Sequence, residues 1–301
     1  MELSVVVPTL NARDELSGCL DALCTHAPDA EVIVVNGPSA DGTTGMVQER
    51  DDVAVLVELA DRSINAARNA GIDRSTGDVV AFLDHRYTIS PQWVGAISQS
   101  LETEASAVTG PKRARIHADE SDETPEQRSI AGRTVTFFQS GNVAVEREVL
   151  DELDGFDEYL EIGGSRDAAH RLATLGRTIA WNGEMSVTNE VSTTQDRHGA
   201  VWNQKYRSLA YRLVKNYNIR PSVIARIVSN ASQDGCSEFT EVGRGNKPFS
   251  AWVKNGFRVL SSTAAGCKDG FISRRKDNSP RRNPRGRSTR TDRAVTVYDW
   301  R

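Results

Sequence analysis

The chain has 301 residues, of which 38% are hydrophobic, and a formal net charge of -4. This length allows one large domain, or one domain with a small appendage, and the hydrophobic content is enough for a sizeable core. No apolar run reaches the roughly 18 residues that a membrane-spanning helix needs, and the N-terminus does not resemble a secretory signal. We therefore expect a cytoplasmic protein. No pair of its four cysteines has metal-ligand spacing, which predicts reduced structural thiols.

The charge is distributed unevenly along the chain. From Glu241 onwards there are 15 Lys and Arg against 5 Asp and Glu, so this region carries +10 and the first 240 residues carry -14. Residues 274–293 consist largely of Arg, Pro, Asn and Ser and contain almost no apolar side chains. This composition predicts disorder near the C-terminus.

The first third of the chain alternates between two patterns. Short runs rich in Val and Ile predict buried strands at 4–9, 31–36, 53–59, 78–83 and 106–110. Segments with helical spacing of apolar residues lie at 12–24, 41–50, 63–75 and from Pro91 onwards. This alternation predicts an α/β fold with a mostly parallel sheet covered on both faces. Ligands of such sheets bind beyond the carboxyl ends of the strands, so residues 8–11, 36–41 and 84–86 are candidates for a binding site.

The remaining elements follow in a less regular order. Residues 117–128 are acidic and predict a mobile surface loop. The next expected elements are a strand through a glycine turn at 137–145, a helix at 166–175 with Gly176 as its C-cap, strands at 178–181 and 185–191, and helices at 200–217 and 249–265.

Six segments occur in the order and spacing of a known family. They are Ser4 to Asn11, Val34 to Thr43, Ala67 to Ile72, Phe82-Leu83-Asp84 with Pro91 and Trp93, Ser140 to Val145 with Gly155 to Glu158, and Arg171-Leu172 with Gly176. Together they resemble the family-2 glycosyltransferases of the GT-A fold. The chain is also similar to soluble members that elongate lipid-linked glycans for archaeal N-glycosylation.

The resemblance implies a domain organisation. Residues 1–195 would form the GT-A catalytic domain, with a Rossmann-like, mostly parallel central sheet that binds a nucleotide. Residues 196–270 would form a helical region and residues 271–301 a basic, disordered tail.

The resemblance also implies which residues bind a nucleotide-sugar donor. Thr9, Asn11 and Asn36 would contact the nucleoside, and Arg68 the base or the diphosphate; the alternative for Arg68 is a surface salt bridge. Family members usually have Asp at the position of Asn36, and an amide offers both a donor and an acceptor. The identity of the base is therefore open, and we expect a UDP-linked sugar.

The metal-binding DxD motif of the family is altered here and reads Asp84-His85-Arg86. One carboxylate for Mg²⁺ or Mn²⁺ remains at Asp84, which would hold the ion loosely or contact the ribose. A guanidinium cannot bind metal but can bind phosphate oxygens directly. The motif thus predicts weakened or absent metal dependence, with Arg86 acting at the leaving group. The alternative is that Arg86 turns toward solvent or an acidic neighbour.

The general base does not follow from the family pattern. Gly164 and Ser165 occupy the positions of the family's Glu-Asp pair, and neither can take a proton from an acceptor hydroxyl. The nearby carboxylates are Asp167 and Glu161. We prefer Asp167, for which the alternative is an ion pair with Arg171 one helical turn away. Glu161 precedes the helix and could swing inward.

The resemblance therefore implies inverting transfer of a sugar from a nucleotide-sugar donor to a lipid-linked glycan of the dolichol phosphate type, for protein N-glycosylation. The altered motifs leave a second interpretation, a non-catalytic nucleotide-sugar- or glycan-binding scaffold of a glycan assembly complex. The basic tail would either attract the anionic cytoplasmic face of a membrane or remain a solvated, disordered segment. It lacks the interleaved aromatic residues that favour nucleic acid. The apolar stripe within 249–265 fits either a bilayer surface or packing on the catalytic domain.

Overall fold

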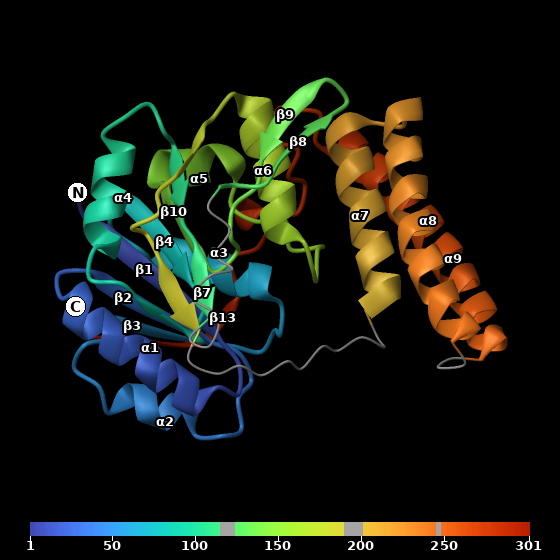
Figure 1. The fold of residues 1–301 in the computed structure, drawn as a ribbon. Helices are drawn as coiled ribbons and strands as arrows, with labels where there is room; N and C mark the ends of the chain where they lie inside the picture. The colour runs from blue at the N-terminus through green and yellow to red at the C-terminus, as the bar shows by residue number, and fades with distance from the viewer. Residues whose placement is uncertain (115–123, 190–200, 245–247) are drawn as a thin grey trace.

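The computed structural model describes residues 1–114, 124–189, 201–244 and 248–301. Its centre is an eight-stranded sheet in the order β11-β6-β10-β4-β1-β2-β3-β13 (Figure 1). The strands are β1 (Leu3–Thr9), β2 (Glu31–Asn36), β3 (Val55–Leu59), β4 (Val79–Leu83), β6 (Ala107–Thr109), β10 (Asn142–Glu146), β11 (Ile179–Trp181) and β13 (Ala294–Asp299). Strands β10 and β13 are antiparallel to their neighbours, and the other pairs are parallel. The prediction of a mostly parallel sheet is confirmed.

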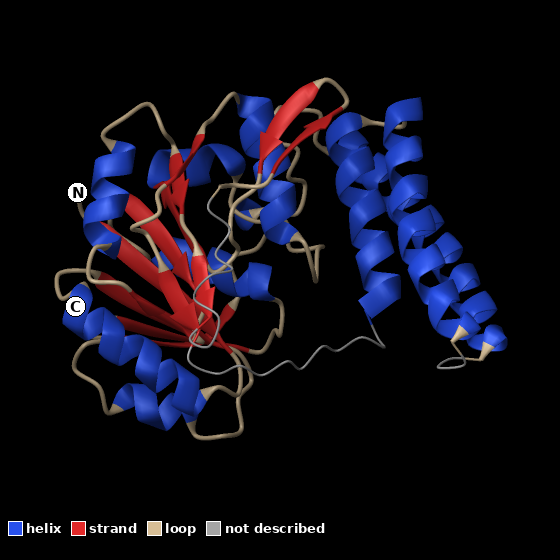
Figure 2. Cartoon of the chain, viewed as in Figure 1, coloured by secondary structure: helices blue, strands red, loops and turns tan. Residues whose placement is uncertain are grey.

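Helices cover both faces of this sheet (Figure 2). One face carries α1 (Arg13–His26), α2 (Thr43–Gln48) and α4 (Trp93–Leu101), and the other carries α3 (Ile64–Arg74), α5 (Arg147–Leu153) and α6 (Gly164–Leu175). Because side chains of a strand alternate between its faces, Val5 and Val7 pack toward α1 whereas Val6 packs toward α3. As predicted, Gly176 ends α6 in the left-handed conformation, with φ of 72°.

Three long helices stand beside the sheet domain, namely α7 (Val201–Tyr217), α8 (Pro221–Gly243) and α9 (Phe249–Lys276) (Figure 1). Helices α7 and α9 lie against each other because two glycines of α9 allow their backbones to approach. A Cβ atom at Gly266 would lie 2.3 Å from the carbonyl oxygen of Arg207, and one at Gly270 would lie 2.5 Å from that of Tyr211. Within the described residues, no helix has the length and apolarity needed to span a membrane.

Two smaller sheets complete the fold. Strands β5 (Tyr87–Ile89), β12 (Val187–Asn189) and β7 (Lys112–Ala114) form one, and the hairpin of β8 (Gln127–Ile130) and β9 (Arg133–Thr136) forms the other. The predicted loop at 117–128 therefore ends in a strand, and its residues 117–123 lie outside the described part of the chain. The predicted strand at 137–145 is confined to β10, since residues 137–141 form a loop.

The C-terminal segment is ordered, contrary to the expectation of a disordered tail. Arg274 to Lys276 complete α9, and the chain then returns to the sheet, where β13 pairs with the edge strand β3. The composition of this segment is misleading because several of its arginines, namely Arg287, Arg290 and Arg293, pair with carboxylates of the acidic sheet domain. Arg293, for example, is only 3% exposed.

Candidate functional site

A pocket opens at the carboxyl ends of β1, β2 and β4, where the rule for parallel sheets predicts a ligand site. Strand ends contribute residues 8–10, 37 and 82–86, and the start of α3 with the preceding loop contributes 61–64, 67 and 68. Ser140 and Gly141 close one wall. The pocket thereby unites four of the residues chosen from the sequence, namely Thr9, Arg68, Asp84 and Arg86.

Arg68 lies at the buried base of this pocket, with 4% of its surface exposed. Its Nη2 donates to the carbonyl oxygen of Ser140 at 2.6 Å and its Nη1 to the hydroxyl of Ser165 at 3.3 Å, and the guanidinium lies 5.0 Å from the centre of the Phe156 ring. Burial lowers the pKa of Arg68 to about 10, against an opposing effect of Asp84. Its Nε has no hydrogen-bond partner among the described residues. Arg68 is therefore not a surface ion-pair residue but a buried cation that lines the strand-end pocket and lacks a partner for its Nε among the described residues.

Arg86 and Asp84 form a two-point ion pair at the mouth of the pocket. The Nε and Nη2 atoms of Arg86 donate to the two carboxylate oxygens of Asp84 at 2.8 and 2.6 Å. Burial alone would raise the pKa of Asp84, but the bonds from Arg86 and the nearby His85 hold it at about 2. Arg86 thus turns toward its acidic neighbour in this state, while 48% of its side chain stays exposed at the pocket mouth.

His85 is a pocket residue that the sequence placed among the strand-end candidates but to which it assigned no role. Its Nδ1 lies 3.1 Å from the carbonyl oxygen of Pro8. With the proton on Nδ1 in this bond, Nε2 is left as an acceptor. The neighbouring Thr9 is 6% exposed, and its hydroxyl has no hydrogen-bond partner within the described residues.

Asn11 and Asn36 organise the loop beside the pocket and are not part of its lining. The side-chain oxygen of Asn11 accepts from the backbone N–H of Ala40 at 2.8 Å. The amide of Asn36 donates to Thr44 at 3.0 Å and accepts from Ser39 at 2.7 Å. Each end of the Asn36 amide therefore already has one partner, and the residue is only 1% exposed.

The residues around Asp84 do not make a ready divalent-metal site. Hard cations such as Mg²⁺ prefer several oxygen ligands. The described ranges contain no group of three or more His, Cys, Asp or Glu side chains that could hold an ion. Both carboxylate oxygens of Asp84 accept hydrogen bonds from Arg86, so a metal would have to share Asp84 with this guanidinium or displace it.

Asp167 lies away from the pocket, within a buried ionic network. It is 0% exposed and receives bonds from Lys215 at 2.7 Å, Arg171 at 2.9 Å and Asn216 at 2.9 Å. Burial opposes its ionisation, but Lys215 and Arg171 hold the pKa of Asp167 well below its usual range. Lys215 also bonds to the buried Asp157 at 2.6 Å. These contacts favour a structural role for Asp167 rather than proton transfer.

Glu161, the other candidate base, is exposed and lines a second hollow. This groove lies between the sheet domain and helices α7 and α9, and it also contains Tyr159 and Arg207. Asp61 and Ser63 belong to the linings of both the first pocket and the groove, so the two hollows are neighbours. Glu161 accepts a hydrogen bond from Gln204 of α7.

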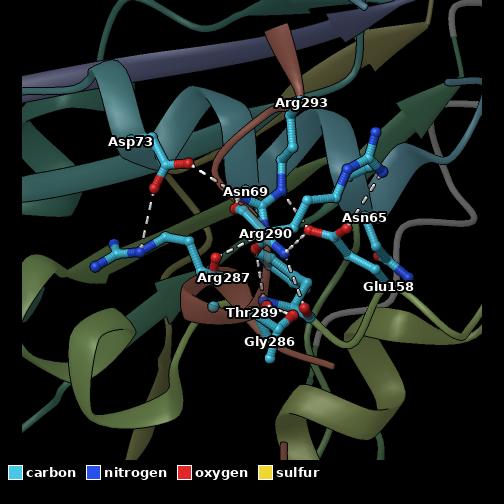
Figure 3. A network of polar contacts seen from close by, with 12 residues as sticks. Asn65, Asn69, Asp73, Glu158, Gly286, Arg287, Thr289, Arg290 and Arg293 are labelled. Carbon is cyan, nitrogen blue, oxygen red and sulfur yellow. Dashed lines mark hydrogen bonds and ion pairs between the residues drawn. The ribbon is translucent and has the colours of Figure 1, made fainter. Parts of the chain in front are cut away.

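The C-terminal segment braces α3, the helix that carries Arg68 (Figure 3). Arg293 donates to Glu158 at 2.5 Å and to Asp73, in the last turn of α3, at 3.1 Å. Glu158 in turn accepts from Asn69 of α3 at 2.7 Å. Arg290 reaches Asp61, a residue shared by both hollows, at 3.2 Å. Residues 277–301, called the strap below, therefore fix one side of the site.

Two solved structures resemble this fold over nearly its whole length. Residues 1–349 of TarS from S. aureus, in complex with UDP-GlcNAc, superpose with a TM-score of 0.62 at 14% identity, covering 92% of this chain and 91% of that structure. The mannosyltransferase PcManGT from Pyrobaculum calidifontis, in complex with GDP-Man and Mn²⁺, gives a TM-score of 0.58 at 17% identity, covering 90% and 87%. The expected GT-A fold is confirmed.

The chain is also similar in sequence to glycosyltransferases of Haloferax volcanii. It is 27% identical to AglE over 195 residues, which are 60% of this chain and 64% of that protein. It is 26% identical to a glucosyl-dolichyl phosphate glucuronosyltransferase over 210 residues, 63% of this chain and 67% of the relative. The first of these matches thus spans somewhat less than two thirds of the relative. Residues 4–156, more than half of the chain, match the family described as "Glycosyl transferase family 2", and the protein belongs to this family.

Proposed function

We propose that this protein transfers a sugar from a UDP-linked donor to a lipid-linked glycan, with inversion at the anomeric carbon, in protein N-glycosylation. The observation that carries the proposal is the adjacency of two hollows. A pocket at the strand ends, with Arg68 and Arg86, shares Asp61 and Ser63 with a polar groove that holds an exposed carboxylate, Glu161. Transfer requires a donor and an acceptor to meet in this way.

The strand-end pocket would take the donor. Arg68 and Arg86 supply positive charge at its base and mouth, where the departing diphosphate gains negative charge. Thr9 offers an unused buried hydroxyl and His85 a ring nitrogen for the nucleoside. The neighbours bound to UDP-GlcNAc and GDP-Man support a nucleotide-sugar ligand.

Donor binding would depend little on a divalent cation. Because Arg86 holds both oxygens of Asp84, a guanidinium stands where the family motif would place a metal. Phosphate oxygens of the donor can share or replace this bond to Arg86, since a guanidinium has five donors.

Glu161 would act as the general base. It is exposed in the groove, whereas Asp167 is enclosed by cations. The acceptor hydroxyl oxygen forms a bond to the anomeric carbon while the bond from that carbon to the diphosphate oxygen breaks. The nucleoside diphosphate leaves with the electron pair, and Glu161 takes the hydroxyl proton.

The acceptor would be presented at the cytoplasmic face of a membrane. The glucuronosyltransferase relative supports a lipid-linked acceptor. Phe249, Phe257 and Leu260 of α9 are 58%, 70% and 68% exposed, so part of the apolar stripe does not pack on the sheet domain. Lys254 and Arg258 flank them. Such a surface suits shallow insertion among anionic headgroups.

Thermal unfolding with nucleotides tests the donor site. UDP, GDP and dTDP would each be added to the full chain, once with Mn²⁺ and once with chelator. Binding to the folded state alone stabilises it by about 2.7 kcal/mol at a hundredfold excess over Kd. We expect UDP to raise Tm, and the shift to persist in chelator.

The outcomes separate the parts of the proposal. A shift with GDP or dTDP alone would reject UDP as the donor nucleotide. A shift that requires Mn²⁺ would reject the substitution of Arg86 for a metal. If none of the three nucleotides changes Tm, the pocket is not a donor site and the proposed function fails.

A further inference from the structure

An arginine-rich cleft, distinct from the donor pocket and the groove, lies between the β8–β9 hairpin and helices α6, α7 and α8. Figure 1 shows these elements around one end of the sheet domain. Among the described lining residues, five cations face two carboxylates, Glu126 and Asp234. The cations are Arg128, Arg166, Lys205, Arg212 and Arg226. Its volume of about 400 Å³ is within the range of small-molecule sites.

Three of the five cations already form ion pairs with the two carboxylates. Glu126 pairs with Arg128 and with Arg166, both at 2.6 Å. Asp234 pairs with Lys205 at 2.5 Å. In the described part of the chain, neither Arg212 nor Arg226 has a carboxylate within ion-pair distance, so the cleft carries positive charge without a partner.

Arg212 is the cation that most clearly lacks a partner. Its Nε is buried and has no hydrogen-bond partner among the described residues, and its Nη1 lies against Gly163, where a Cβ atom would come within 2.7 Å. Burial, followed by repulsion from Arg166, lowers the pKa of Arg212 to about 10. A bound anion would relieve this unfavourable burial of positive charge.

The cleft lies beside the donor pocket, separated by the first turn of α6. Ser165 in this turn bonds to Arg68 of the pocket, whereas Gly163 and Arg166 line the cleft. Glu161, our proposed base, immediately precedes these residues. A molecule anchored in the cleft could therefore extend past the start of α6 toward the reacting centre.

We propose that this cleft binds an anionic group, a phosphate or a carboxylate, of the acceptor. Arg212 and Arg226 would hold its oxygens through charge-assisted hydrogen bonds. Phe137, Leu209 and Leu213 supply an apolar wall for the ring or chain that carries the group. The assignment to the acceptor rests on the proposed function, whereas the binding of an anion does not.

Calorimetric titration tests the site without requiring turnover. Inorganic pyrophosphate and glucuronate would be titrated separately into the full chain in the presence of excess UDP and chelator. We expect at least one of them to bind, the tighter of the two identifying the source as phosphate or carboxylate. Arg212→Gln and Arg226→Gln should each weaken this binding about tenfold or more, because each removes a charge-assisted bond.

Two control variants locate the binding. Arg258→Gln removes an exposed cation of α9, and Arg86→Gln alters the donor pocket, so both should leave the affinity unchanged. If neither anion binds, or if Arg86→Gln abolishes binding while Arg226→Gln does not, the proposal is overturned. Arg226 is partly exposed and keeps the test informative if Arg212→Gln fails to fold. A Tm shift with UDP is read independently of these titrations, so failure of the donor site is distinguishable from failure of the cleft.

Discussion

Asp167 and Glu161 lie six residues apart in opposite environments, and each environment predicts a different phenotype. Asp167→Asn leaves Lys215 and Arg171 without their shared charge in a buried network. It should lower the free energy of unfolding by about 3–5 kcal/mol. Glu161→Gln replaces an exposed side chain, so it should lower kcat by about 100-fold or more while stability stays within about 0.5 kcal/mol.

Urea unfolding of both variants, followed by turnover with a UDP-sugar, checks this contrast. An Asp167→Asn protein that is stable but inactive would indicate that Asp167 is the general base. Full activity of Glu161→Gln would remove Glu161 from that role.

The pair of Arg86 and Asp84 predicts a change in metal response. Arg86→Gln frees both oxygens of Asp84 and removes the charge near the leaving diphosphate. The loss of one such electrostatic contact should lower kcat by about 100- to 1,000-fold. Added Mn²⁺ should recover part of the activity in the variant but have little effect on the unaltered protein.

Turnover measured across a Mn²⁺ series in both proteins tests the substitution directly. Equal Mn²⁺ dependence of the two proteins would contradict it. An Arg86→Lys variant is the matched control, because it keeps the charge but loses the two-point geometry.

Several of these residue contacts could not be predicted from sequence. The strand-end rule and the motifs correctly brought Thr9, Arg68, Asp84 and Arg86 to one pocket. The role of Asp167 depends on Lys215, a residue on α7 that lies 48 positions later in the chain. Likewise, the local bonds that occupy Asn36 arise from the loop conformation and not from a periodic pattern.

The strap contains a buried arginine, Arg293, and we expect the stability of the protein to depend strongly on it. Arg293→Ala would remove the buried cation that links Glu158 to Asp73, so that Asp73 keeps only Arg287 and Glu158 only the more distant Arg290 as cationic partners among the described residues. Burial and repulsion by Glu158 already raise the pKa of Asp73. We expect a loss of about 3 kcal/mol or more in the free energy of unfolding.

Arg301→Ala is the matched control in the same segment. The side chain of Arg301 is 33% exposed and its partners are near the surface, so its removal should cost about 1 kcal/mol or less. Urea titration of both variants gives the comparison. Equal, small losses would show that the strap contributes little to stability.

The exposed face of α9 predicts membrane binding. A Phe257→Asp and Leu260→Asp double variant should sediment less with vesicles containing anionic lipid, because it removes two side chains available for insertion. Its Tm should change little, since both positions are more than half exposed. Unaltered sedimentation of the variant would exclude this face, and a Phe239→Asp variant on α8 would show whether the neighbouring helix also contributes.

Among the helices and strands, local sequence patterns correctly predicted β1 to β4 and the helices between them. The strand β13 was missed because its partner β3 is distant in sequence, and because its charged flanks hide a short alternating pattern. Helix α8 was missed because polar residues interrupt its apolar spacing. Packing against α9 stabilises this helix instead. Trp252 of α9 donates a hydrogen bond to the carbonyl oxygen of Gly235 in α8 at 3.0 Å.

The pH dependence of the whole molecule follows from groups that are buried in one charge state. Burial, together with Arg212, lowers the pKa of His170 to about 3, so the folded state keeps this ring neutral. An unfolded histidine binds a proton below about pH 6.5. Stability should therefore fall as the pH drops from about 6.5 to 3, by up to about 1.4 kcal/mol per pH unit from His170.

The lowered pKa values of Asp84 and Asp167 affect the stability of the folded state over a second, more acidic pH range. Their contribution is present above the ordinary carboxyl pKa of about 4 and is lost as the pH falls toward 2. Urea unfolding between pH 3 and 8 measures the profile. A His170→Gln variant should flatten it between pH 6.5 and 4, and an unchanged slope in that variant would show that another group is responsible.

The pairing of β13 with β3 also sets an order of events during synthesis. Strand β3 ends at Leu59, and its edge partner leaves the ribosome about 240 residues later. At roughly 5–20 residues per second, this edge stays open for about 10–50 s. Throughout that interval a nascent chain exposes a row of unpaired backbone groups next to a hydrophobic strand. Strand β13 thus covers the edge of a sheet whose first strands are synthesised much earlier, and a product that lacks β13 would keep this edge of β3 unpaired.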